Sequence, residues 1–152
     1  MPDTEHFVRD DVRTFLAMVQ AMGGKGVEEV GAVEGRKQMR AMGGLAEAPP
    51  RDMAVIKNLT CPGPAGAIPL RFYDTRESRD LGPCVLFLHG GGFVIGDLEV
   101  YNSLCTEIAF QLDLPVVSVD YRLAPEHPFP AAPDDCEAAA RWLASSPEAL
   151  ER

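Results

Sequence analysis

Val85-Leu-Phe-Leu-His-Gly-Gly-Gly-Phe93 is the stretch that decides the fold, because an apolar run ends there directly in three consecutive glycines. A second apolar run, Val-Val-Ser-Val-Asp, occupies residues 116–120. Runs of this kind are typical of strands buried on both faces of a parallel sheet. Between them, apolar residues at helical steps of four predict a helix over residues 98–112, with Asp97 as its N-cap. The residues at these steps are Leu104, Ile108 and Leu112, and Cys105 and Ala109 lie beside them on the same predicted face. A strand, a helix and a strand within about 35 residues indicate a right-handed βαβ unit.

Further predicted elements lie on both sides of this unit. Residues 53–60 and 68–73 flank a turn cluster of proline and glycine, which predicts an antiparallel pair at one sheet edge. Residues 134–145 form the last predicted helix. Near the start of the chain, apolar residues at steps of three and four predict a helix over residues 5–22, and a weaker pattern predicts a broken helix over 25–48 that ends at a pair of glycines. The predicted fold class is α/β, with a mixed, mostly parallel sheet flanked by helices.

Composition limits the classes of function open to a chain of 152 residues, which is long enough for one domain. Lys and Arg number 14 against 23 Asp and Glu, and this net charge of −9 disfavours nucleic acid as a partner. No apolar run approaches the roughly 20 residues of a membrane span, and the acidic start does not resemble a secretory signal. Four well-separated cysteines predict free thiols in a cytoplasmic protein, and three scattered histidines predict no metal site. We expect no cofactor.

The glycine loop, residues 89–97, follows a predicted strand and precedes a predicted helix, where open α/β sheets bind ligands. A dinucleotide fingerprint fails because it needs a glycine at Ile95. A phosphate-binding P-loop fails because Gly96 is followed by Asp97 rather than by lysine. A strand followed by this glycine pattern is also the oxyanion-binding device of lipases and esterases. The residues alone therefore favour an oxyanion site and leave open a glycine-rich turn without a ligand.

Two long motifs resemble the hormone-sensitive lipase family of α/β-hydrolase carboxylesterases. The first is His-Gly-Gly-Gly-Phe-Val-Ile-Gly-Asp at 89–97, and the second is Val-Asp-Tyr-Arg-Leu-Ala-Pro-Glu-His-Pro-Phe-Pro-Ala-Ala at 119–132. The similarity covers roughly residues 50–145. It implies an incomplete α/β-hydrolase fold, in which residues 1–48 form a helical cap segment and residues 49–152 form the N-terminal half of the hydrolase domain.

The resemblance implies roles for the residues of the first motif. The backbone N–H groups of Gly91 and Gly92 would form the oxyanion hole, and His89 and Gly90 would shape the loop that carries them. The substrate would be a small, short-chain acyl ester.

Other residues of the two motifs would contact the substrate or support the loop. Phe93 and Val94 would contact the substrate. The residues expected to brace the loop are Asp120, Tyr121, Arg122 and Glu126, whose opposite charges suit charge-assisted hydrogen bonds. We expect His127 to be a packed or surface residue rather than a catalytic base.

The residues of a serine mechanism are the part of the pattern that is missing. An α/β-hydrolase carries its nucleophile in Gly-x-Ser-x-Gly, followed by an acid and a histidine. No serine here has glycines at that spacing, and no histidine follows His127. We therefore expect the triad to lie beyond Arg152 and the chain alone to be inactive. Its partner would be its own C-terminal half, or a second copy, at an open sheet edge beside residues 85–89. The alternative is a non-catalytic module that binds acyl ligands.

Overall fold

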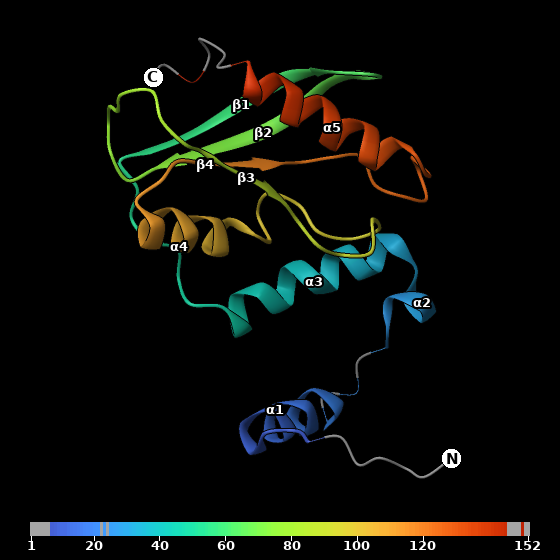
Figure 1. The fold of residues 1–152 in the computed structure, drawn as a ribbon. Helices are drawn as coiled ribbons and strands as arrows, with labels where there is room; N and C mark the ends of the chain where they lie inside the picture. Colours follow the sequence, from blue (N-terminus) through green and yellow to red (C-terminus); the bar gives the residue numbers. More distant parts are fainter. Residues whose placement is uncertain (1–6, 22, 24, 146–149, 151–152) are drawn as a thin grey trace.

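The computed structural model of the chain describes residues 7–21, 23, 25–145 and 150. Its elements, in chain order, are α1 (Asp10–Ala21), α2 (Val27–Val30), α3 (Ala32–Ala46), β1 (Val55–Gly63), β2 (Gly66–Asp74), β3 (Val85–Leu88), α4 (Asn102–Leu112), β4 (Val116–Val119) and α5 (Ala131–Ala144). Within these residues, four strands form one mixed sheet. Helix α5 covers one face of the sheet, and α4 and α3 lie on the side of the other face (Figure 1).

The strand order β1-β2-β4-β3 places the glycine loop at one edge of the sheet. β3 runs parallel to β4, with Leu86 opposite Val117, which confirms the predicted parallel pair. β1 and β2 form the predicted antiparallel pair, and β2 also pairs antiparallel with β4. The expectation of a mostly parallel sheet is not met among the described strands. Two of the three strand pairs, β1 with β2 and β2 with β4, are antiparallel, because the β1–β2 hairpin pairs directly with β4.

Strands β3 and β4 differ in burial although both sequences are apolar. Every residue of β4 is buried, as expected for a strand with a neighbour on each side and helices on both faces. β3 is an edge strand of the sheet that the described residues form, and Leu88 at its end is 44% exposed. The open edge expected beside residues 85–89 is therefore present among the described strands, and burial on both faces is complete for β4 but only partial for β3, whose other three residues are half-buried.

Two apolar clusters hold the sheet between its helices. The first joins β2 and β4 to α5, and its buried members include Leu70, Phe72, Val117, Val119 and Ala139. The second joins the opposite face to α4, and its buried members are Tyr73, Cys105, Ala109 and Val116. Removal of this apolar surface from water is the main force that fixes the carboxyl ends of β3 and β4 side by side.

Helix α4 differs from its predicted form in both its start and its buried face. It begins at Asn102 rather than at residue 98. Leu104 and Leu112, which the spacing placed on the apolar face, are exposed. The buried residues of the helix are smaller: Cys105, Thr106 and Ala109. Small side chains let the helix approach the sheet closely, so the leucines lie outside the contact.

The N-terminal helices follow the predicted outline. The weak pattern over residues 25–48 folds as α2 and α3, which confirms the break, but α3 continues past the glycine pair to Ala46. Helix α1 fills most of the predicted 5–22, of which residues 5, 6 and 22 lie outside the described part. None of the residues of α1 is buried, and the helix stands apart from the sheet in Figure 1. No described helix is long and apolar enough to cross a membrane.

Candidate functional site

The glycine loop begins at the carboxyl end of β3 with a tight turn. The carbonyl of Gly91 accepts the N–H of Val94 at 3.1 Å and the N–H of Ile95 at 3.0 Å. Gly91 has a φ of 126°, and a side chain there would overlap the Ile95 carbonyl, so the position requires glycine. The N–H groups of Gly91 and Gly92 make no hydrogen bond within the described part of the chain. Two neighbouring unpartnered donors form a site for an anionic or developing oxygen.

His89 anchors the start of this loop. Its side chain is buried, with the residue 4% exposed, and its ring centroid lies 4.2 Å from that of Tyr121 and 5.4 Å from that of Tyr101. Nδ1 lies 2.8 Å from the Gly90 carbonyl oxygen, which can only accept, so Nδ1 carries the proton. Tyr121 donates its hydroxyl to the His89 carbonyl at 2.5 Å. Burial raises the pKa of Tyr121 to about 12, so this hydroxyl remains a donor at neutral pH.

Asp97 ends the loop, but not as the helix N-cap that the sequence predicts. Its Oδ1 accepts the N–H groups of Glu99 and Val100, both at 2.9 Å, and so caps a turn that precedes α4. The Nε of Arg40 in α3 donates to Oδ2 at 2.6 Å. Burial acts to raise the pKa of Asp97, but the Val100 amide and Arg40 outweigh it and lower the pKa overall. The carboxylate therefore stays ionised and fixes the end of the loop.

Phe93 and Val94, the residues expected to contact substrate, lie in the middle of the loop. Phe93 is 58% exposed, and its ring centroid lies 6.2 Å from that of Tyr121. Its φ of 61° is unusual for a residue with a side chain. The Phe93 carbonyl accepts the N–H of Ala124 at 2.8 Å, which joins the glycine loop to the proline loop, residues 121–130. Val94 is half-buried. The Phe93 ring is thus the more accessible of the two.

The four residues expected to brace the loop do not act as one group. Tyr121 lies against the loop through the contacts described above, and Asp120, next to it, is half-buried. Burial raises the pKa of the Asp120 carboxyl. Glu126 accepts hydrogen bonds at 2.9 and 2.7 Å from Arg36 of α3, so it reaches the loop only through that arginine.

Arg122 makes a different contact, with helix α5. Its Nε and Nη2 each donate to the carboxylate of Asp135 at 2.8 Å, and its backbone N–H donates to the same group at 3.0 Å. Asp135 is 2% exposed. Burial acts to raise the pKa of Asp135, but the hydrogen bonds from Arg122 outweigh it and lower the pKa. Arg122 therefore ties the proline loop to α5. His127, further along that loop, is exposed.

Arg36 was not among the residues expected at this site. Its Nε donates to the Val94 carbonyl at 2.8 Å, and its Nη2 donates to the Ala124 carbonyl at 2.9 Å, in addition to the pair with Glu126. These partners lie 58 to 90 residues away along the chain. An arginine within a weakly patterned, charged helix carries no local signal for such contacts, so only the tertiary structure identifies it.

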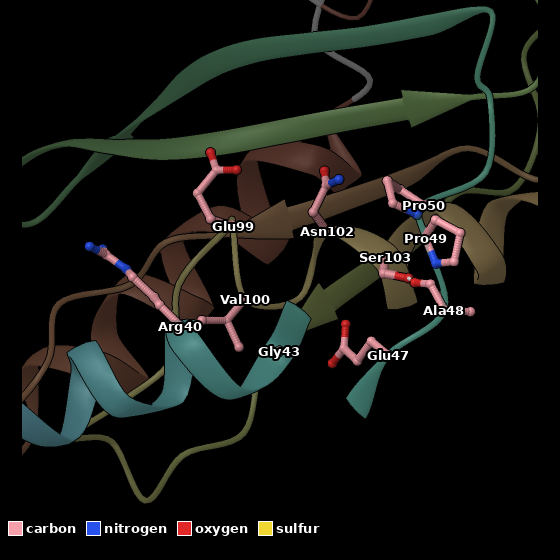
Figure 2. Close-up of a pocket in the computed structure, with 10 residues that line it drawn as sticks. All are labelled: Arg40, Gly43, Glu47, Ala48, Pro49, Pro50, Glu99, Val100, Asn102 and Ser103. Atoms are coloured by element: carbon pink, nitrogen blue, oxygen red, sulfur yellow. Dashed lines mark hydrogen bonds between the residues drawn. The ribbon is translucent and has the colours of Figure 1, made fainter. Parts of the chain in front are cut away.

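Two cavities border α3. One, of about 390 Å³, opens between the end of α3 and the start of α4, and its polar lining includes Ser103, which donates to the Ala48 carbonyl at 2.5 Å (Figure 2). The other, of about 370 Å³, is lined by Met39 and Met42 of α3 and by Ile95 of the glycine loop. The second cavity is therefore the one whose lining suits an acyl chain. Among the described residues, no group of three or more His, Cys, Asp or Glu side chains is arranged to hold a metal ion.

No described serine has the surroundings of a nucleophile. Ser103 donates its hydroxyl to the Ala48 carbonyl, and Ser145 donates to the Trp142 carbonyl at 2.6 Å. Ser118 is fully buried in β4. Within the part of the chain that the structure covers, no hydrogen bond joins a serine to a histidine.

Known proteins with similar sequences include ester hydrolases. The family described as alpha/beta hydrolase fold matches residues 85–151. An esterase of Mycobacterium tuberculosis, Esterase LipI, is 50% identical over 91 residues, which are 59% of this chain and 28% of that protein. The ethyl acetate hydrolase of Pseudomonas putida is 34% identical over 149 residues, which are 92% of this chain and 46% of that protein.

Solved structures give the same result. An ester hydrolase from the metagenome of Lake Arreo has a TM-score of 0.85 and 38% identity, over 92% of this chain and 46% of that one. An esterase of Pyrobaculum calidifontis has a TM-score of 0.74 and 35% identity, over 91% of this chain and 43% of that one. The chain spans about half the length of these relatives. The chain is therefore a partial α/β hydrolase, and the proteins it is similar to are esterases and lipases of the hormone-sensitive lipase family.

Proposed function

We propose that this chain supplies the oxyanion hole of a serine carboxylesterase that hydrolyses short-chain acyl esters. The observation that carries the proposal is the pair of unpartnered N–H groups of Gly91 and Gly92 at the carboxyl end of β3. When a nucleophile attacks an ester, the carbonyl oxygen becomes an oxyanion. Two fixed N–H donors stabilise that charge more in the transition state than in the ground state. The lineage is one of carboxylesterases and lipases, and the relatives include an ethyl acetate hydrolase, which supports a small substrate.

The surroundings of the donor pair fit this role. The His89 ring, held on Tyr121 and bonded to Gly90, keeps the loop in place before any substrate arrives. Donors that need no reorganisation during the reaction are the effective ones. Phe93 and Val94 would contact the substrate. The cavity beside Met39 would take the acyl chain under a cap formed by residues 1–48.

The nucleophile, the acid and the base come, in this proposal, from outside residues 1–152, because no serine here lies in Gly-x-Ser-x-Gly. The chain alone would then not turn over an ester. We propose that its own C-terminal half binds at the β3 edge and brings these groups; a second copy is the other occupant that an edge strand admits. Serine chemistry needs no cofactor. None of the four cysteines, all of which the structure describes, forms a disulfide, and this favours a cytoplasmic location.

A non-catalytic module that binds acyl ligands is the second candidate. The cavity of about 370 Å³ favours it, because its lining, which includes Met39, Met42 and Ile95, comes from this chain and needs no triad.

The test compares the chain alone with the chain extended by the reading frame that follows the codon for Arg152. We expect p-nitrophenyl acetate to be hydrolysed no faster with the chain alone than in buffer. We expect the extended protein to hydrolyse it, and a fluorophosphonate to stop that reaction. In the extended protein, Gly92→Ala keeps the backbone N–H but strains a position with a φ of 61° by about 1–2 kcal/mol, so it should lower kcat by no more than roughly 5–30-fold, with little change in KM. Phosphonate-sensitive turnover by the chain alone would place the nucleophile within it. Saturable binding of a fatty-acyl probe without turnover by either protein would favour the binding module.

A further inference from the structure

The guanidinium of Arg36 lies where the glycine loop meets the proline loop, and it comes from a third segment, α3. Nε donates to the Val94 carbonyl at 2.8 Å, and Nη2 donates to the Ala124 carbonyl at 2.9 Å. Val94 belongs to the glycine loop and Ala124 to the proline loop. One side chain therefore holds a backbone carbonyl of each loop, and both bonds are charge-assisted and of normal length.

Val94 and Ala124 are also held through their own N–H groups, by bonds within and between the loops. The N–H of Val94 donates to the Gly91 carbonyl at 3.1 Å. The N–H of Ala124 donates to the Phe93 carbonyl at 2.8 Å. Both Val94 and Ala124 thus have their N–H bonded toward the oxyanion turn and their C=O bonded to Arg36, so the arginine fixes their orientation.

Glu126 fixes the orientation of the guanidinium itself. Its two oxygens accept from Nη1 and Nη2 at 2.9 and 2.7 Å, a bidentate arrangement. The hydrogen bond from Arg36 lowers the pKa of Glu126 to about 2, so the carboxylate stays charged at any pH near neutrality. The carbonyl contacts and the ion pair use different N–H groups of one planar fork, which lysine cannot reproduce.

The residue enclosed by these bonds is Phe93, whose φ of 61° is strained for a residue with a side chain. Such a conformation persists only where its surroundings hold it. We propose that Arg36 is a positioning residue for the oxyanion hole, which from α3 holds Gly91 and Gly92 in their donor conformation. It does so through the carbonyl of Val94, the residue after Phe93, and through the carbonyl of Ala124, whose N–H bonds the Phe93 carbonyl. The catalytic meaning of this role rests on the function proposed above. The positioning itself is a property of this chain.

The test measures amide hydrogen exchange by NMR in the full chain and in Arg36→Met, Arg36→Lys and Glu126→Gln. We expect Arg36→Met to speed exchange of the Val94 and Ala124 amides by roughly 10- to 100-fold, the range for loss of charge-assisted bonds. Exchange of Val117 in the sheet should not change. Glu126→Gln should have a smaller effect, because the carbonyl bonds remain. Arg36→Lys should restore only part of the protection.

The matched control is Lys37→Met, which removes a neighbouring charge of α3 that pairs only with Glu34. Ethylguanidinium added to Arg36→Ala, which leaves room for it, should return the amide chemical shifts of Gly91 and Gly92 toward their original values, a response that loss of general stability would not give.

Three results would overturn the inference: unchanged exchange at Val94 and Ala124 in Arg36→Met, equal acceleration in the sheet, or the same effect from Lys37→Met. None of these readouts depends on ester turnover. If exchange responds as expected but the extended protein hydrolyses no ester, the proposed function fails and the positioning role stands. If the protein hydrolyses esters and Arg36→Met leaves loop exchange unchanged, the positioning role fails alone.

Discussion

Replacing Gly96 by alanine should disturb the glycine loop much more than the same change at Gly92. Both positions have a positive φ, 100° at Gly96 and 61° at Gly92, so each alanine carries backbone strain of about 1–2 kcal/mol. The two positions differ in the space around them. A Cβ at Gly96 would lie 2.5 Å from His89 Nδ1 and 2.7 Å from the Gly90 carbonyl oxygen, whereas a Cβ at Gly92 has nothing within 4 Å.

The overlap at Gly96 adds a second cost to the strain. The His89 ring is buried against Tyr121 and bonded to Gly90, so it cannot move aside without losing those contacts. Overpacking of this kind costs about 1–3 kcal/mol. The expected loss in the free energy of unfolding is therefore about 2–5 kcal/mol for Gly96→Ala and about 1–2 kcal/mol for Gly92→Ala. A domain has only about 5–15 kcal/mol in total.

Urea unfolding followed by circular dichroism measures this difference. With a slope near 2 kcal/mol per molar urea, the midpoint should fall by about 1–2.5 M for Gly96→Ala and by about 0.5–1 M for Gly92→Ala. Equal falls for the two variants, or a midpoint for Gly96→Ala at or above that of the parent chain, would refute the contact of His89 with Gly96 and with it the loop conformation described here.

Three further predictions concern other parts of the chain. Asp135→Asn should lower the free energy of unfolding in urea by about 1–3 kcal/mol at pH 7. Because the folded-state pKa of Asp135 is lowered, the stability that this carboxylate contributes is complete above the ordinary pKa near 4 and is lost as the pH falls through the folded pKa. A stability difference between the variant and the parent chain that stays constant down to pH 2 would contradict this prediction. The exposed pair variant Glu137→Gln is the control. Iodoacetamide at pH 8 should alkylate half-buried Cys84 roughly 100-fold faster than Cys105, as measured by mass spectrometry. Cys105 is buried, and burial raises the pKa of its thiol to about 11. Leu88→Lys at the β3 edge should reduce concentration-dependent association in sedimentation velocity, and unchanged association would mean that another surface is involved.

The sequence was sufficient for the βαβ unit and the glycine loop, because both depend on local patterns. Four consecutive apolar residues before three glycines place a strand end and a turn with little ambiguity. The buried face of α4 was not predictable in the same way. The predicted face held both the leucines and, beside them, Cys105 and Ala109; the close approach of the helix to the sheet buries only the smaller residues. Helix α5 begins at Ala131, three residues before the predicted start, because Pro133 fits within the first turn of a helix.

The support of the loop was the least predictable feature, because it depends on contacts across the tertiary structure. Tyr121 follows β4, and the parallel pairing of β3 with β4 brings it beside His89 at the end of the neighbouring strand. That contact could be expected once the two strands were paired. The contacts of Arg36 could not, since they require the position of α3 over the two loops, which no sequence pattern specifies.

The supports of the oxyanion turn all come from within this chain, and this bears on how a catalytic site could be completed. On the N-terminal side of Gly91 and Gly92, the His89 carbonyl accepts the Tyr121 hydroxyl. On their C-terminal side, the Phe93 carbonyl accepts the N–H of Ala124, and the Val94 carbonyl accepts the Nε of Arg36. The conformation of the turn is therefore set by the chain itself and does not wait for a nucleophile. If the proposed function holds, a segment that binds at the β3 edge would need only to bring a serine, a base and an acid to donors that are already in place. Binding energy at that edge would then be available to position the nucleophile rather than to order the loop.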